Sequence, residues 1–159
     1  MFFFHIYSII GRLTQVLSST KKILIVVLLT FGYTLLMAKI LLAEDDLFLR
    51  DIYTEILTGE GFDLSVAVDG DEALKKLLKG QWDLVLLDVV MPKMTGIEIL
   101  EYIKSKKADK RYAKHILLMT NSDEIRGIKE VKDLLDEILL KSSFTPGELI
   151  AKIKEYLGN

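Results

Sequence analysis

The chain has 159 residues, of which 50% are hydrophobic and 28% charged, a composition that suits one folded domain rather than a disordered chain. It contains no cysteine, which excludes a disulfide framework, a thiolate metal site and a cysteine nucleophile. Its formal net charge of −2 combines two unlike parts. Residues 1–37 carry three basic side chains and no acidic ones, whereas residues 38–159 hold the other 18 basic and all 23 acidic side chains. An apolar, basic N-terminal extension therefore precedes an acidic body.

The sequence leaves three interpretations of this extension open. Residues 23–38 run for 16 positions without a charge, after the Lys21–Lys22 pair, and a membrane-spanning helix needs about 17–25 apolar residues. The segment could be a membrane anchor, or a signal peptide with a poor cleavage site, since Leu36 stands where a small residue is needed. The third interpretation is a start codon assigned too far upstream, with Met37 as the true start. It is favoured because a complete beginning of a domain follows Met37 directly.

Between residues 38 and 157, short apolar runs alternate with amphipathic stretches, which are typical of buried strands and of helices with one apolar face. Strands are predicted at 40–43, 64–68, 84–87, 115–119 and 138–140. Helices are predicted at 47–58, 71–79, 97–106, 124–135 and 146–157. This alternation predicts an α/β domain of the (βα)5 type, with a parallel sheet covered by helices on both faces.

Polar residues stand at several of the predicted strand ends. In parallel α/β sheets the working site lies beyond the carboxyl ends of the strands. The residues at these ends are Glu44, Asp45 and Asp46 after the first strand, Asp88 after the third, Thr120 after the fourth and Lys141 after the fifth.

These residue types suit one chemistry in particular. Clustered carboxylates repel one another unless a cation neutralises them, and oxygen ligands in an open site suit Mg²⁺. A lysine ammonium and a threonine hydroxyl suit phosphoryl oxygens, and an aspartate can be the nucleophile that forms an aspartyl phosphate. The set therefore predicts Mg²⁺-dependent phosphoryl transfer onto Asp88.

Taken singly, each residue has a structural interpretation. Asp45 or Asp46 could simply cap the following helix, and Asp88 could cap a turn. Thr120 alone would most often be a solvated or capping hydroxyl, and Lys141 alone a surface charge. Their joint occurrence at the strand ends is what favours the functional interpretation. His115 has no ligand-like neighbours in the sequence, and we expect it to be a partly buried strand residue rather than a phosphoacceptor.

Over residues 38–157 the sequence resembles the receiver domains of two-component response regulators. The segment 40–46 is similar to the family's first strand and acidic pocket, and the segment 88–96, DVVMPKMTG, is similar to its phosphorylation loop, D-x-x-M-P-x-M-x-G. Thr120 and Lys141 match its hydroxyl and lysine positions. The resemblance implies the flavodoxin-like topology, a three-layer sandwich with sheet order 2-1-3-4-5.

The resemblance also implies a role for each site residue. Asp88 would accept a phosphoryl group from a histidine kinase or a phosphotransfer protein. Mg²⁺ would be bound by Asp45, Asp88 and the backbone carbonyl of Val90, with Glu44 acting through water. The remaining positions would hold the phosphoryl oxygens, namely Lys141 and Thr120, or shape the loop, namely Met91, Pro92 and Gly96.

Several positions depart from the family pattern. Ile138 occupies the position of an aromatic switch residue, and Ser142 follows the lysine where the family usually has a cis proline. Because a cis bond before another residue costs about 2.5–4 kcal/mol, we expect a trans bond there. Asn121 replaces a small residue, and residues 133–136 replace a Gly-Ala pair. These changes suggest a specialised output face and remove no catalytic group.

The sequence favours a stand-alone receiver that signals through contacts with an effector protein, and leaves its classification as an enzyme open. The body's charge of −5 argues against direct nucleic-acid binding. The expected location is the cytoplasm, or the cytoplasmic face of a membrane if residues 23–38 are an anchor. Two other functions remain open. One is an Asp-nucleophile phosphohydrolase, disfavoured because Val90 replaces the second acid. The other is a receiver-like interaction module without phosphorylation.

Overall fold

The computed structural model describes residues 37–106, 112–121 and 126–158. The chain divides into two compact units, and the strands and helices of the fold belong to the second, Ala38–Asn159. The interpretations of the N-terminal extension concern residues outside the described part. Within the described ranges, none of the helices combines the length and hydrophobicity needed to cross a membrane.

Five strands form one sheet in the order β2-β1-β3-β4-β5, and every neighbouring pair is parallel. This confirms the predicted topology. The strands are β1 (Lys39–Ala43), β2 (Asp63–Ala67), β3 (Trp82–Asp88), β4 (Ala113–Thr120) and β5 (Glu137–Leu140). All are close to their predicted ranges because short apolar runs mark strands that are buried on both faces.

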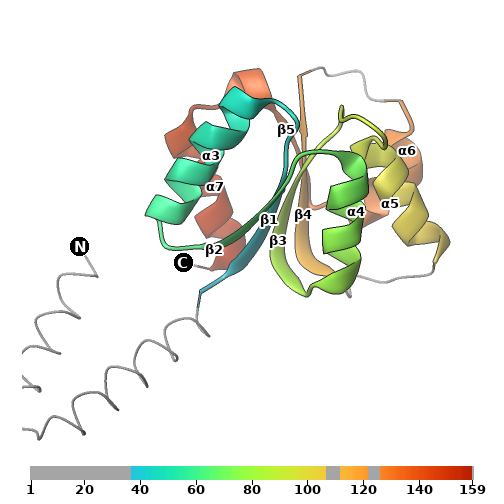
Figure 1. Cartoon of the computed structure of the whole chain (residues 1–159), viewed down its shortest axis with the longest axis horizontal. Helices are drawn as coiled ribbons and strands as arrows, with labels where there is room; N and C mark the ends of the chain where they lie inside the picture. The colour runs from blue at the N-terminus through green and yellow to red at the C-terminus, as the bar shows by residue number, and fades with distance from the viewer. Residues whose placement is uncertain (1–36, 107–111, 122–125, 159) are drawn as a thin grey trace, which may run out of the picture. The chain divides into compact units, whose positions relative to one another are not determined.

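Helices cover both faces of the sheet (Figure 1). One face packs against α3 (Leu47–Gly59) and α7 (Pro146–Leu157), and the other against α4 (Gly70–Lys79), α5 (Gly96–Ser105) and α6 (Ile128–Val131). Two 3-10 turns, η1 (Lys132–Leu134) and η2 (Lys141–Ser143), flank β5.

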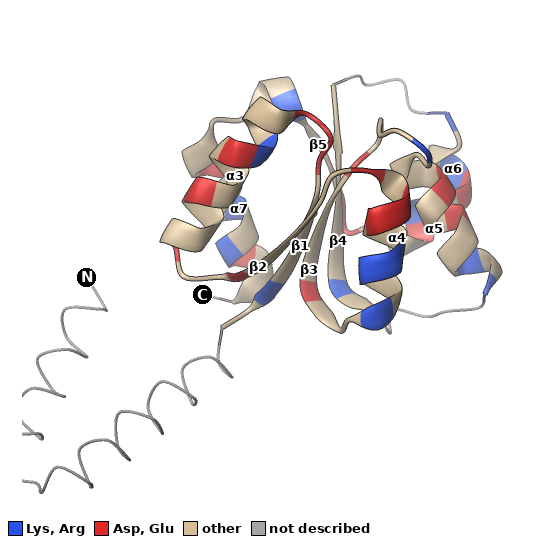
Figure 2. Ribbon diagram, in the orientation of Figure 1, with Lys and Arg blue, Asp and Glu red and all other residues tan. Residues whose placement is uncertain are grey.

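The apolar side chains of each strand alternate between two cores. In β1, Ile40 and Leu42 pack toward α3 and α7, whereas Leu41 and Ala43 pack toward α4 and α5. Burying a leucine or isoleucine side chain fully stabilises the fold by about 1.5–3 kcal/mol. Charged residues lie on the helices and at the ends of the strands (Figure 2). The middle of the sheet is therefore apolar, and charged side chains are found at both ends of the strands.

Local capping signals fix where two helices begin. Thr95 caps α5 and Thr145 caps α7; in each case the Glu three residues later completes a capping box with the cap residue. The start of α5 at Gly96 also fixes where the loop that begins at Asp88 ends.

The predicted helix 124–135 is wrong in length. Regular helix is limited to α6, which is followed by the 3-10 turn η1, and residues 122–125 lie outside the described part. Gly127 precedes α6 with φ of 79°, a left-handed conformation that cannot continue a right-handed helix. The apolar residues in this segment are spaced so that Val131 is buried and Leu134 packs against the core. One turn of α-helix followed by a 3-10 turn is enough to place both side chains there.

Candidate functional site

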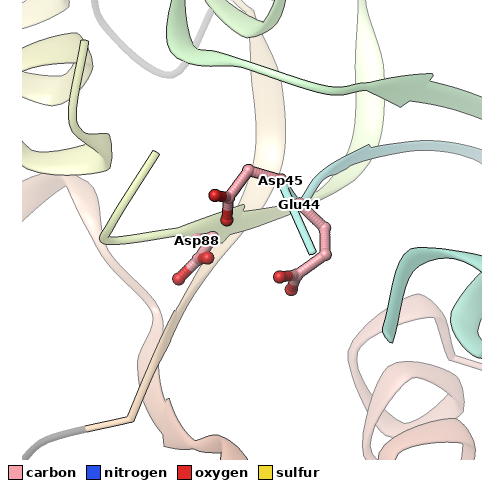
Figure 3. A group of neighbouring side chains, drawn as sticks. All are labelled: Glu44, Asp45 and Asp88. Carbon is pink, nitrogen blue, oxygen red and sulfur yellow. The ribbon is translucent and has the colours of Figure 1, made fainter. Parts of the chain in front are cut away.

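Three carboxylates converge where β1 and β3 end. Ala43 pairs with Leu87, so the next residues, Glu44 and Asp88, stand side by side at the carboxyl edge of the sheet. Glu44, Asp45 and Asp88 each offer an oxygen, and these oxygens all lie within 4.8 Å of one another (Figure 3). Glu44 and Asp88 are buried and Asp45 is exposed, so the cluster opens to solvent on the side of Asp45.

Lys141 brings its ammonium group into this cluster. Its Nζ lies 2.8 Å from Oδ2 of Asp88, and 2.9 and 2.8 Å from Oε1 and Oε2 of Glu44. The Lys141 side chain is only 5% exposed. The interpretation of Lys141 as a surface charge is therefore wrong. The expectation that side chains at the strand ends lie close together is met by Glu44, Asp45, Asp88 and Lys141.

Burial shifts the protonation of these groups. Desolvation raises the pKa of Glu44 and of Asp88, and the hydrogen bonds from Lys141 only partly oppose it. For Lys141, burial alone would lower the pKa, but its bonds to Asp88 and Glu44 raise it. Glu44 and Asp88 thus share one ammonium group, and added positive charge would stabilise the ionised forms of these two carboxyls.

The donor set fits a magnesium ion. All three candidate ligands are carboxylate oxygens, which Mg²⁺ prefers, and the exposed side of Asp45 leaves space for the waters that Mg²⁺ retains. Oε2 of Glu44 is buried and already lies 2.8 Å from the positively charged Nζ of Lys141. Such an atom is a favourable neighbour for a cation.

Two residues at the start of α3 support the acidic segment. Asp46 caps the helix by accepting a hydrogen bond from the amide of Leu49 at 2.8 Å, in agreement with the capping interpretation. Arg50 donates from Nη1 to the backbone carbonyls of Glu44 (3.0 Å) and Asp45 (2.8 Å). The sequence interpretation missed Arg50. Its position in the first turn, where side chains point back toward the helix start, is the signal that could have identified it.

The loop from Asp88 to Gly96 connects β3 to α5 and carries the other predicted site residues. The Val90 amide lies 3.4 Å from Oδ1 of Asp88, while its side chain is 71% exposed. Met91 is buried in the core beneath the loop. A Cβ at Gly96 would lie 2.3 Å from the carbonyl oxygen of Asp88, so only glycine permits this close approach of the two loop ends.

Thr120 is the last residue of β4 and is buried. It stands one position beyond Met119, the β4 residue that pairs with Asp88. Ile138 lies on β5 with its side chain exposed, and the bond from Lys141 to Ser142 is trans, as predicted.

His115 lies far along β4 from this edge. It is partly buried, and its ring centroid lies 5.2 Å from that of Tyr156. Its Nδ1 lies 3.4 Å from Oδ1 of Asp136. These contacts agree with the expectation that His115 is structural.

Comparison with known proteins assigns the family. The family model described as response regulator receiver domain matches residues 40–154. Among curated relatives, the DNA-binding response regulator MtrA of Mycobacterium tuberculosis (strain H37Rv) is 31% identical over 119 residues, covering 75% of this chain and 50% of MtrA. A CpxR homolog of Haemophilus influenzae, named as a transcriptional regulatory protein, is 38% identical over 121 residues, covering 76% of this chain and 51% of the relative. The chain thus spans about half the length of these relatives.

Solved structures agree with the sequence comparison. The response regulator TrrA of Thermotoga maritima, in complex with Mg²⁺ and BeF, is 37% identical with a TM-score of 0.63, over 76% of this chain and 99% of TrrA. Chemotaxis protein CheY4 of Vibrio cholerae is 30% identical with a TM-score of 0.63, over 76% of this chain and 98% of CheY4. Together with the flavodoxin-like sheet and its acidic edge, these matches show that the chain belongs to the response regulator receiver family of two-component systems.

Proposed function

We propose that this chain accepts a phosphoryl group on Asp88 from a histidine kinase or a phosphotransfer protein, with Mg²⁺ held by Asp45, Asp88 and the backbone carbonyl of Val90. The observation that carries the proposal is the convergence of three carboxylates within 4.8 Å of one another with an ammonium group 2.8 Å from Asp88. The raised pKa of Asp88, caused by burial, makes a cation beside it favourable for its nucleophilic, ionised form.

Each side chain has a defined part in the transfer. A carboxylate oxygen of Asp88 attacks phosphorus, and the bond from phosphorus to the donor's imidazole nitrogen breaks, with the electron pair leaving on nitrogen. Lys141 and the hydroxyl of Thr120 hold phosphoryl oxygens. Glu44 keeps the Lys141 ammonium beside Asp88 and acts on the ion through water. Bound Mg²⁺ supplies positive charge that offsets the charge on the phosphoryl oxygens.

The loop residues Met91, Pro92 and Gly96 hold the backbone path between Asp88 and α5. Phosphorylation then changes a surface through which the domain contacts an effector. The acidic body, with a charge of −5 over residues 38–159, supports protein contact over direct nucleic-acid binding as the output. We place this activity in the cytoplasm.

The test is to incubate the full chain with Mg²⁺ and acetyl phosphate and to measure its intact mass. The wild type should gain the mass of one phosphoryl group, and Asp88→Asn should not. Asp83→Asn is the matched control, because Asp83 lies at the opposite end of the same strand, beside Lys114. Sustained turnover of phosphate esters would instead support a phosphohydrolase. Failure of every donor, including phosphorylated kinase, would refute the proposal and support an interaction module.

A further inference from the structure

We propose that the start of α4 positions the phosphoacceptor loop, and that Lys93 is a positioning residue for the metal and phosphoryl site. This inference rests on the proposed function, because it concerns the same site. It assigns a role to Asp69, Gly70 and Lys93, none of which lies among the residues that bind the ion or the phosphoryl group.

The first contact joins the two backbones. The amide of Gly70 donates a hydrogen bond of 3.1 Å to the carbonyl of Pro92, in the middle of the loop. A Cβ at Gly70 would lie 1.8 Å from the carbonyl oxygen of Met94 and 2.6 Å from its carbonyl carbon. The loop therefore rests directly on α4, at a distance that only glycine allows.

The second contact is an ion pair. Nζ of Lys93 lies 2.6 Å from Oδ2 of Asp69, whose other oxygen accepts the amide of Glu72 and caps α4. The Asp69 side chain is only 14% exposed, so the helix holds this carboxylate in place. The backbone of Lys93 has φ of 71°, a left-handed conformation that residues other than glycine rarely adopt. The ion pair thus holds Lys93, with its unfavourable backbone conformation, against Asp69 at the start of α4.

These contacts fix the middle of a loop whose ends are already held. Asp88 ends β3, and the amide of Gly96 donates to the carbonyl of Val89 at 2.9 Å. Val90 lies between these anchors and has a mostly exposed side chain, so its own packing does little to orient its carbonyl. The orientation of that carbonyl, a proposed Mg²⁺ ligand, consequently depends on where the next residues are held: Met91 by the core, and Pro92 and Lys93 by the start of α4.

The first experiment measures Mg²⁺ affinity by isothermal titration calorimetry on the full chain, for the wild type and Lys93→Gln. Loss of positioning should weaken Mg²⁺ binding by about twofold to fivefold, the size expected for a partly exposed ion pair. A purely electrostatic effect has the opposite sign, because removing a positive charge from the rim of an acidic site should strengthen Mg²⁺ binding. Lys93→Arg keeps the ion pair and should restore the wild-type affinity.

Lys114→Gln is the matched control. Nζ of Lys114 lies 2.7 Å from Oδ1 of Asp83, with the lysine exposed and the aspartate mostly buried, as in the Lys93 pair. This pair sits at the opposite end of β3 and β4 from Asp88. Its loss should leave Mg²⁺ affinity unchanged.

A second pair of variants tests the backbone contact. Gly70→Ala forces the loop away from α4 and should reduce the rate of phosphorylation by acetyl phosphate about tenfold, because misplacement of reacting groups is costly. Gly59→Ala is its control, since a Cβ at Gly59 meets nothing within 4 Å. Circular dichroism checks that each variant folds, and if Gly70→Ala does not, the Lys93 variants decide.

Unchanged or stronger Mg²⁺ binding in Lys93→Gln would overturn the inference, as would an equal loss in Lys114→Gln. Because Mg²⁺ binding is measured without a phosphoryl donor, it distinguishes the two proposals. A wild type that binds Mg²⁺ but is never phosphorylated would refute the proposed function and leave the Mg²⁺ measurement to decide on the α4 contact.

Discussion

The Lys141 ammonium is the most consequential single charge in the site, and Lys141→Met removes it while keeping most of the side-chain volume. Its partners Glu44 and Asp88 are almost fully buried. Removing one partner of a buried ion pair costs about 3–5 kcal/mol, because the remaining charge stays uncompensated. Exposed Asp45 admits water at one side, which favours the lower end of this range. We therefore expect the free energy of unfolding to fall by about 3 kcal/mol.

The free energy of unfolding is measured by urea denaturation of the full chain in EDTA, with circular dichroism as the signal. For a domain of this size the loss corresponds to a melting temperature lower by roughly 10 °C. Lys154→Met is the matched control, since its Nζ lies 2.6 Å from Glu60 but both side chains are well exposed. Its cost should stay below about 1 kcal/mol.

Magnesium provides the second arm of this experiment. Because Mg²⁺ replaces the missing positive charge beside Glu44 and Asp88, it should stabilise Lys141→Met more than the wild type. The reasoning fails if Lys141→Met costs no more than Lys154→Met in EDTA, or if Mg²⁺ stabilises the variant and the wild type equally.

Three further changes test other parts of the fold. Arg50→Gln removes the charge-assisted bonds to the carbonyls of the acidic segment and should lower the free energy of unfolding by about 1.5 kcal/mol in urea; no change would show that these bonds do not support the segment. Leu86→Ala empties a fully buried position between β1 and β4 and should cost about 3 kcal/mol in the same assay, whereas a cost below about 1 kcal/mol would contradict the close packing. Burial and the hydrogen bond to Glu137 raise the pKa of Tyr156 to about 12. Because this folded-state pKa exceeds the unfolded value of about 10, the stability that it contributes is complete below about pH 10 and is lost as the pH rises toward 12. The stability difference between the wild type and Tyr156→Phe should therefore shrink over that alkaline range, and a difference that stays constant with pH would refute the assignment.

The strands and most helices could be predicted because their signals are local. A run such as Leu84–Leu87 is apolar at every position because both faces of a central parallel strand are buried. The boxes that begin at Thr95 and Thr145 mark helix starts within four residues of sequence. The convergence of the strand-end carboxylates could also be predicted, since the topology of a parallel sheet puts the carboxyl ends of its strands at one edge.

The segment after β4 shows the limit of local signals. Its apolar residues recur at roughly helical spacing, but they pack through one short helix and a 3-10 turn after Gly127. Periodicity reports which residues are buried and does not report how many turns of regular helix bury them.

By itself, the sequence determined the fold class, the strand-end residues and the chemistry that those residue types suit. Only the tertiary structure decided which groups touch. It brought Lys141 onto Glu44, 97 positions away, placed Arg50 on the carbonyls of the acidic segment, and set Gly70 against the loop between β3 and α5. The physical reason is that hydrophobic patterning specifies burial along one element, whereas contacts between side chains depend on strand register and helix packing, which are fixed only when the whole core closes.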